Sequence, residues 1–283
     1  MSQAGDAAKS TRIVRVTNDD THVLANGHTP TDMRLTVLGT GSALPSPTRL
    51  QTGAAVECAD ESLLVDCGSG VCHRLAQSAI DYHDIETVLL THTHLDHVAD
   101  LPTLAKARLL DGHETFTIVG PQGTQDICDA LFAVDDLADR LSLTVRELSP
   151  GTNPFTINEF EIERAPTDHS KLGYAYRFNG QLTITGDTAP TESVCSLADG
   201  SKVLVHECAY PDGTESSGHS MPTALGQLLA DVDVNHILLT HLFPETEPHA
   251  DELVSTISKY TDASVEVATD NMSLTIGEWD RRV

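Results

Sequence analysis

Four residues of metal-binding type occupy six positions in Thr91-His-Thr-His-Leu-Asp-His97, and this segment constrains the fold more than any other. Its candidate ligands, His92, His94, Asp96 and His97, cannot share one helical face, whereas a strand ending in a loop directs them inward as two pairs. The preceding run, residues 87–90, is apolar and typical of a buried strand. The segment therefore predicts half of a two-metal site. The alternative is a surface histidine cluster that binds metal adventitiously.

Other apolar runs also end in polar residues. Leu63–Val65 precedes Asp66, Leu182–Thr185 precedes Gly186-Asp187, Val203–Val205 precedes His206-Glu207, and Ile237–Thr240 precedes His241. Strand ends that gather polar side chains at one edge of a packed layer are typical of an active site. From Met33 onward, short apolar runs alternate with glycine turns and helical stretches, which predicts an α/β or α+β layered domain.

Residues 33–283 are expected to form the catalytic domain. Residues 1–32 are polar and turn-rich, with one β-like stretch at Arg12–Thr17. This N-terminal extension is interpreted as an added edge hairpin, a flexible tail or the product of a start site assigned too early, and the sequence does not choose among them.

Composition limits the partners. Acidic residues outnumber basic ones by 42 to 17, which gives a net charge of -25. A nucleic-acid enzyme normally carries a basic stripe that neutralises phosphates, and this chain has no Lys/Arg cluster. A high-salt cytoplasm would also explain the charge, because salt screens the repulsion among surface carboxylates.

No apolar run reaches the roughly 18 residues of a membrane span, and no signal-peptide core begins the chain. We therefore expect a soluble, cytoplasmic protein that does not bind membranes.

An ordered series of short motifs extends from about Met33 to Trp279. It comprises Leu38-Gly-Thr-Gly-Ser-Ala-Leu-Pro45, Leu64-Val-Asp-Cys-Gly68, the histidine segment, Gly120-Pro-Gln-Gly123, His169, Gly186-Asp-Thr188, His206-Glu207, Gly218-His-Ser220 and Leu239-Thr-His241. Together these motifs resemble the metallo-β-lactamase fold and, within it, the ribonuclease Z-like group of phosphodiesterases. The resemblance implies an αββα sandwich of two mixed sheets flanked by helices, with the metal site at one edge.

The resemblance also implies a ligand set for two divalent metal ions. His92, His94 and His169 would bind one ion, Asp96, His97 and His241 the other, and Asp187 would bridge them. Two such cations share a hydroxide, lower its pKa and clamp the oxygens of an in-line phosphoryl displacement. Zinc is the preferred ion for imidazole and carboxylate ligands, although manganese or iron also suits them.

Three residues are candidates for proton transfer. Asp96 is expected to orient or deprotonate the attacking water, because a carboxylate accepts hydrogen bonds beside the metals. Glu207 and His219 match family positions where a carboxylate holds an imidazole that protonates the leaving oxygen. Asp66 has two open interpretations, support of a metal ligand or simple capping of a turn.

The chain departs from the tRNA-processing members of the group. Those proteins commonly carry a long basic arm, which in the bacterial form lies between the segments matching His169 and Asp187, and here only residues 170–186 lie between them. The serine and arginine that usually follow the last ligand are replaced by Leu242-Phe-Pro-Glu245, and the early loop at residues 45–51 lacks the usual lysine and asparagine. These departures favour small substrates over structured RNA.

The leading hypothesis is a dinuclear metal-dependent hydrolase of phosphodiester bonds, acting on small or cyclic nucleotides or short oligonucleotides. Three alternatives stay open: a tRNA 3′-processing endoribonuclease, an ester, thioester or lactam hydrolase, and a metal-bound binding protein without catalysis. The resemblance further implies a homodimer.

Overall fold

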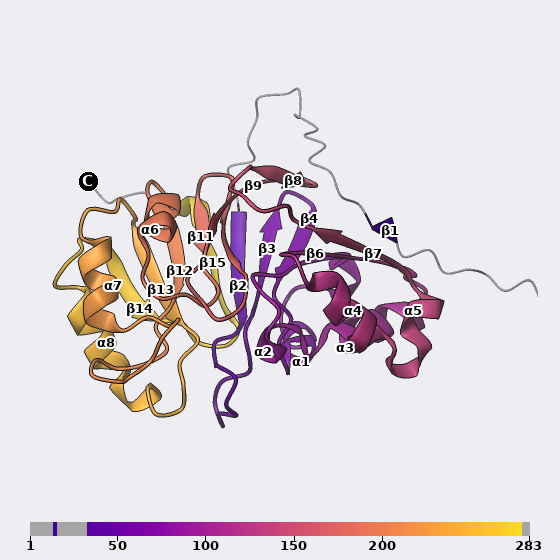
Figure 1. Ribbon diagram of the computed structural model, residues 1–283, viewed down its shortest axis with the longest axis horizontal. Coiled ribbons are helices and arrows are strands. Elements are labelled where there is room, and N and C mark those ends of the chain that lie inside the picture. Colours follow the sequence, from indigo (N-terminus) through magenta and orange to yellow (C-terminus); the bar gives the residue numbers. More distant parts are fainter. Residues whose placement is uncertain (1–13, 16–32, 279–283) are drawn as a thin grey trace, which may run out of the picture.

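The computed structural model describes residues 14–15 and 33–278 of the chain, and their strands form two sheets packed face to face (Figure 1). The first sheet contains, in spatial order, β1 (Val14–Arg15), β7 (Ser142–Glu147), β6 (Thr115–Gly120), β5 (Thr87–Leu89), β4 (Glu61–Val65), β3 (Gly53–Cys58), β2 (Met33–Gly39) and β15 (Met272–Thr275). The second contains β14 (Ser264–Val267), β13 (His236–Thr240), β12 (Val203–Glu207), β11 (Leu182–Ile184), β10 (Tyr174–Phe178), β9 (Phe160–Pro166) and β8 (Phe155–Ile157).

Both sheets are mixed. In the first, β4 to β7 pair in parallel, whereas β2, β3, β4 and β15 pair antiparallel. In the second, β11 to β14 pair in parallel and β8 to β11 antiparallel. The parallel strands of each sheet therefore present their carboxyl ends at one edge, where a site can form.

Strands buried on both faces explain why the apolar runs of the sequence are nearly continuous. In β4, Leu63 and Val65 pack into the cluster between the two sheets, whereas Leu64 faces the opposite cluster. In β12, Val205 packs between the sheets, and Leu204 packs into the cluster on the opposite face of the second sheet. Because side chains alternate along a strand, both faces need apolar residues when both are covered.

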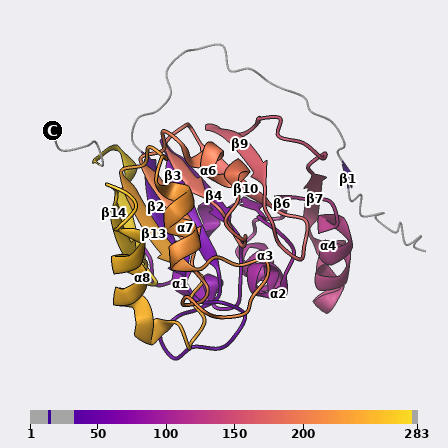
Figure 2. The same ribbon diagram turned by 60° about the vertical axis from the view of Figure 1, so that its left-hand side comes forward.

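Helices cover the two outer faces. On the first sheet lie α1 (Val71–Leu75), α3 (Leu101–Leu110), α4 (Thr124–Phe132) and α5 (Leu137–Arg140), and on the second lie α6 (Glu192–Ala198), α7 (Pro222–Leu229) and α8 (Ala250–Ile257). Figure 2 shows α7 and α8 side by side over the second sheet. The layers are thus helix, sheet, sheet, helix, and the predicted αββα sandwich of two mixed sheets is confirmed.

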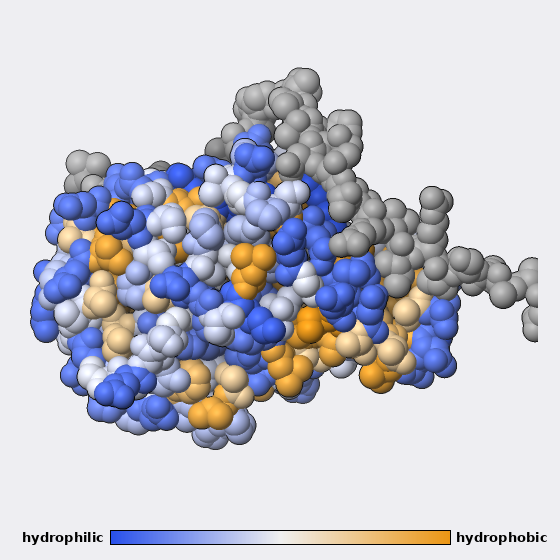
Figure 3. All heavy atoms as spheres, in the orientation of Figure 1, coloured by the Kyte–Doolittle hydropathy of each residue, from blue (hydrophilic) through white to orange (hydrophobic). Residues whose placement is uncertain are grey.

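The interpretations of residues 1–32 lie mostly outside the described residues. Within the described part, Val14 and Arg15 pair in parallel with Thr144 and Val145 at the edge of the first sheet. The domain boundary at residue 33 stays a prediction. None of the described helices has the length and apolar character that a membrane crossing requires. The face shown in Figure 3 is mostly hydrophilic, with apolar residues scattered over both halves.

Candidate metal centre

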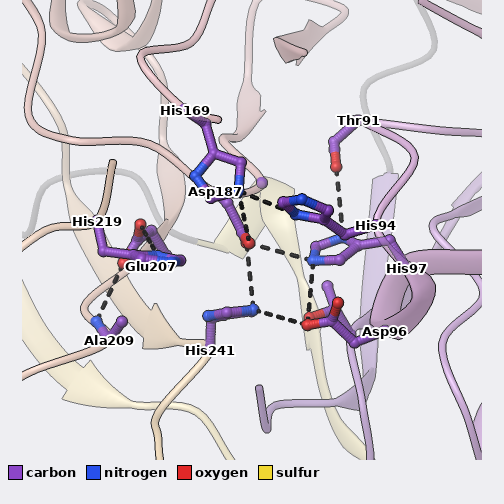
Figure 4. A network of polar contacts seen from close by, with 12 residues as sticks. Thr91, His94, Asp96, His97, His169, Asp187, Glu207, Ala209, His219 and His241 are labelled. Carbon is purple, nitrogen blue, oxygen red and sulfur yellow. Dashed lines mark hydrogen bonds and ion pairs between the residues drawn. The ribbon is translucent and has the colours of Figure 1, made fainter. Parts of the chain in front are cut away.

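The polar residues that end the buried strands gather at one edge of the sandwich (Figure 4). His92 follows β5 of the first sheet, whereas Asp187 and His241 follow β11 and β13 of the second. His169 comes from the loop that joins β9 to β10, which opens at the same edge. The centre is therefore assembled from both sheets, as the strand-end pattern predicts.

The histidine segment differs in one respect from the predicted strand end and loop. After β5 the chain makes one turn of helix, α2 (Leu95–Val98), with His94 at its N-cap. The backbone nitrogen of His97 donates to the carbonyl oxygen of His94 at 3.0 Å, and that of Ala99 to Leu95 at 2.9 Å. This turn separates the pairs: His92 and His94 precede it, and Asp96 and His97 lie within it.

The seven predicted ligands converge as two overlapping sets. The donor atoms within each set lie within 4.8 Å of one another. One set consists of His92, His94, His169 and Asp187, and the other consists of Asp96, His97, Asp187 and His241. The structure thus brings together every residue that the sequence proposed as a ligand, in the grouping that the resemblance implied.

Asp187 belongs to both sets and lies between them. Its Oδ1 is 3.3 Å from Nε2 of His97 and 3.3 Å from Nε2 of His241. Its Oδ2 is 3.6 Å from Nε2 of His92 and 3.7 Å from Nε2 of His169. Each carboxylate oxygen therefore faces a different pair of imidazoles, which is the arrangement a bridging ligand needs.

The donor atoms fit metal ions better than they fit one another. Asp187 Oδ1 and His97 Nε2 are buried, and although they lie 3.3 Å apart, neither makes a well-aligned hydrogen bond with any residue that the structure describes. Unpaired buried polar atoms are costly in a folded protein unless something else satisfies them. Imidazole nitrogens and carboxylate oxygens at this spacing suit divalent transition metals, so the residues fit two cations.

Burial keeps the first pair of imidazoles available as ligands. It lowers the pKa of His92 well below its ordinary value, and the pKa of His94 is lowered for the same reason. A neutral imidazole has a free lone pair for coordination. Burial alone would raise the pKa of Asp187. The electrostatic attraction of His241, His97 and His92 outweighs burial and holds the pKa of this carboxyl well below its usual range.

Asp66 orients His97. Its Oδ2 accepts from Nδ1 of His97 at 2.7 Å, and the side chain also accepts from the backbone nitrogen and hydroxyl of Thr91 at 2.8 and 2.7 Å. A carboxylate on one ring nitrogen fixes the tautomer that offers the other nitrogen to a metal. Of the two open interpretations of Asp66, the structure favours support of a metal ligand over turn capping, because the side chain bonds His97 and Thr91, which lie 31 and 25 residues away in the sequence.

Close backbone approaches at two glycines allow these segments to meet. A Cβ on Gly68 would lie 2.0 Å from the carbonyl oxygen of Asp96, and one on Gly186 would lie 2.6 Å from Thr91. Gly186 also has a left-handed φ of 62°. Neither position accommodates a side chain, which explains glycine beside Asp187 and after the Asp66 turn.

Glu207 and His219 form the pair that the family resemblance implied. Glu207 is buried at the end of β12, and its Oε1 accepts from Nδ1 of His219 at 3.0 Å. The same carboxylate accepts three backbone N–H groups, those of Thr188, Ala209 and Ser220. Burial would lower the pKa of His219, but its hydrogen bond to Glu207 and the nearby carboxylates outweigh burial and raise it.

Two aromatic residues beside this pair were not predicted as site residues from the sequence. Tyr210 and Phe243 stack on each other with ring centroids 4.5 Å apart, and both lie about 6 Å from the ring of His219. Isolated aromatic residues carry no local signal of their own. The one available clue was Phe243, which lies within the segment that replaces the usual serine and arginine.

The chain is 25% identical to a ribonuclease Z from Methanothermobacter thermautotrophicus over 88% of this chain and 98% of that protein. It is 31% identical to a ribonuclease Z from Mycobacterium marinum, over 64% of this chain and 72% of that protein. Among solved structures, the metallo-β-lactamase fold protein YhfI from Bacillus subtilis aligns with a TM-score of 0.75 and 24% identity, covering 86% of this chain and 99% of that one.

A family model described as Anti-Pycsar protein Apyc1 matches residues 33–258, which include every predicted ligand and the Glu207–His219 pair. Together with the ribonuclease Z relatives and the shared fold, this match shows that the chain belongs to the Anti-Pycsar protein Apyc1 family, within the ribonuclease Z-like group of metallo-β-lactamase-fold proteins.

Proposed function

We propose that this protein is a dinuclear metal-dependent phosphodiesterase that hydrolyses small or cyclic nucleotides or short oligonucleotides. One observation carries the proposal: two ligand sets share Asp187, and the Glu207–His219 pair lies beside them. Paired cations suit in-line displacement at phosphorus, and an adjacent imidazole suits protonation of a leaving alkoxide.

The ligand roles are part of this proposal. His92, His94 and His169 hold one ion, Asp96, His97 and His241 hold the other, and Asp187 serves both. We propose zinc, because imidazole nitrogens outnumber carboxylates in the combined set. When bound, the two cations lower the pKa of water and neutralise the charge of the phosphodiester.

The protein's own residues supply the proton transfers. Asp96 is buried among the ligands, with its Oδ2 3.3 Å from Nε2 of His241, and we assign to this carboxylate the orientation and deprotonation of the attacking water. His219 donates from Nδ1 to Glu207, which leaves its Nε2 as the nitrogen that would protonate the leaving oxygen. Glu207 positions His219 and stabilises its protonated form.

Small substrates fit this chain better than structured RNA. The net charge of -25 opposes a polyanion, and the segment between His169 and Asp187 contains β10, β11 and their connections, with no room for a long arm. The curated relatives named ribonuclease Z favour phosphodiester chemistry over ester or lactam hydrolysis. They also make tRNA 3′ processing the second candidate.

The test is hydrolysis of bis(p-nitrophenyl) phosphate by protein reconstituted with zinc or manganese, at low and molar salt. We expect turnover that is abolished by a chelator and restored by metal. Cyclic nucleotides and a precursor tRNA are then compared as substrates, and faster cleavage of the tRNA would favour the second candidate. Two bound metals without turnover of any diester would contradict the proposal and favour ester or lactam substrates or a binding role.

We also propose a cytoplasmic homodimer. Leu95 lies between two ligands yet is 68% exposed, and Leu172 in the His169 loop is 48% exposed. Apolar side chains exposed beside a site are typical of a surface that another chain covers. Sedimentation equilibrium at low and molar salt should give twice the monomer mass, and Leu95→Asp should shift it toward the monomer. A monomeric wild type at both salt concentrations would contradict this.

A further inference from the structure

The rings of Tyr210 and Phe243 form a stacked pair at the edge of the metal centre, which we call the aromatic wall. Tyr210 follows β12 and Phe243 follows β13, and their rings are 4.5 Å apart with an angle of 21° between their planes. The ring of Phe243 lies 6.0 Å from that of His241, a candidate ligand, at 71°. The wall therefore stands directly beside the centre.

The wall is also next to the proposed acid. The ring of Tyr210 lies 5.8 Å from that of His219 at 80°, and Phe243 lies 6.0 Å from it at 79°. His219 and His241 are themselves parallel, with centroids 5.6 Å apart. Both rings of the aromatic wall therefore lie on the side of the centre where His219 would protonate the leaving group.

The backbone holds the wall in place before any substrate arrives. The amide nitrogen of Phe243 donates to the carbonyl oxygen of Ala209 at 3.3 Å, and the hydroxyl of Thr246 donates to the same oxygen at 2.6 Å. The amide of Thr246 in turn donates to the carbonyl oxygen of Phe243 at 2.8 Å. These bonds join the two loops, so the rings lose little freedom when a ligand binds.

Core packing does not account for these rings. Both are only half-buried, and neither belongs to the three apolar clusters formed by the described residues. Partly exposed aromatic rings beside a phosphate-binding centre are suited to stacking on a nucleobase, because every base has a π-face.

We propose that the nucleobase of the substrate stacks on the Tyr210–Phe243 pair, on a ring face that the other ring leaves uncovered, while the metal centre holds its phosphate. This inference rests on the proposed phosphodiesterase function and adds a base-binding subsite to it. Because stacking is tolerant of base identity, the wall serves pyrimidines and purines alike. Removing one ring should weaken use of a nucleotide about tenfold or more.

The test compares two substrates that differ only in the base. One is a nucleoside 3′,5′-cyclic monophosphate, taken with a pyrimidine and with a purine, and the other is the same ribose cyclic phosphate with hydrogen in place of the base. Phe243→Leu keeps apolar bulk without the ring, and Phe243→Tyr is the matched control that keeps the ring. We expect Phe243→Leu to lower kcat/KM for the nucleotides about tenfold more than for the base-free compound, mainly through KM, whereas Phe243→Tyr preserves the wild-type ratio.

A second readout does not depend on turnover. The base protons of a 5′-nucleotide bound to the zinc-loaded protein should show an upfield ring-current shift in proton NMR, and Phe243→Leu should reduce it. Equal losses for both substrates, or an unchanged ring-current shift, would overturn the base-binding role while leaving the phosphodiesterase intact. A wild-type protein that cleaves neither compound would overturn the proposed function, and the inference with it.

Discussion

Asp187→Ala is expected to release both metal ions and to lower the rate of diester hydrolysis by more than about a hundredfold. Replacing a residue that only supports a ligand typically costs 10- to 100-fold in affinity or activity, so loss of a shared ligand should exceed that range. The structure gives the reason, since Oδ1 of Asp187 lies 3.3 Å from two imidazoles of one set and Oδ2 lies within 3.7 Å of two imidazoles of the other. No other residue in the two sets serves both.

Metal content after dialysis, measured by mass spectrometry, checks this result directly. The matched control is Asp168→Ala, which removes an exposed carboxylate next to His169 and should retain two ions. Thermal unfolding gives a second check, because a ligand at a thousand times its Kd stabilises the folded state by about 4 kcal/mol. Added zinc should raise the Tm of the wild type far more than that of Asp187→Ala. Two tightly held ions in Asp187→Ala would refute the bridging role.

His219→Ala is expected to keep both metal ions and to lose about 10²- to 10⁴-fold in rate, the usual contribution of a positioned general acid. The loss should depend on the leaving group. A ribose alkoxide needs a proton when its bond to phosphorus breaks, whereas p-nitrophenolate leaves without one. The variant should therefore lose much more activity on a cyclic nucleotide than on bis(p-nitrophenyl) phosphate.

The pH profile separates this role from a structural one. Because Glu207 and the nearby carboxylates raise the pKa of His219, its proton is present below that pKa and is lost as the pH rises through it. The wild-type rate should fall on the alkaline side, and His219→Ala should lack that limb. His249→Ala, an exposed histidine in the 3-10 helix Glu247–His249, is the control. Metal loss from His219→Ala equal to that from Asp187→Ala would contradict both assigned roles.

Local sequence signals were enough to predict a layered α/β or α+β domain and the half-site at His92, His94, Asp96 and His97, whereas the αββα sandwich and the full ligand set came from the family resemblance. Apolar runs that end in Asp66, Asp187 and His241 marked buried strands and their polar ends. Once both sheets had been inferred, these ends had to meet at one edge because parallel strands share their direction. The grouping of the ligands into two sets came from the family resemblance, since His169 and Asp187 are far from residues 92–97 in the sequence.

The sequence could not predict contacts made only by tertiary packing. Asp66 supports His97 because β4 and β5 are neighbours in register, and a turn-capping aspartate looks the same in the sequence. Tyr210 and Phe243 meet because β12 and β13 are adjacent, and neither residue belongs to a periodic pattern. The single helical turn at Leu95–Val98 was also missed, because four residues are too few to show helical periodicity.

The ligands come from two sheets formed by different halves of the chain, residues 33–147 and 155–267, apart from the edge strands β1 and β15. Neither half alone contains a complete set: Asp96 and His97 belong to the first half, and Asp187 and His241 to the second. High metal affinity can therefore arise only after both halves have folded and docked, so metal uptake reports the last step of folding. The supply of metal would then select correctly assembled molecules, because bound ions stabilise them against proteolysis while half-folded chains bind too weakly to benefit.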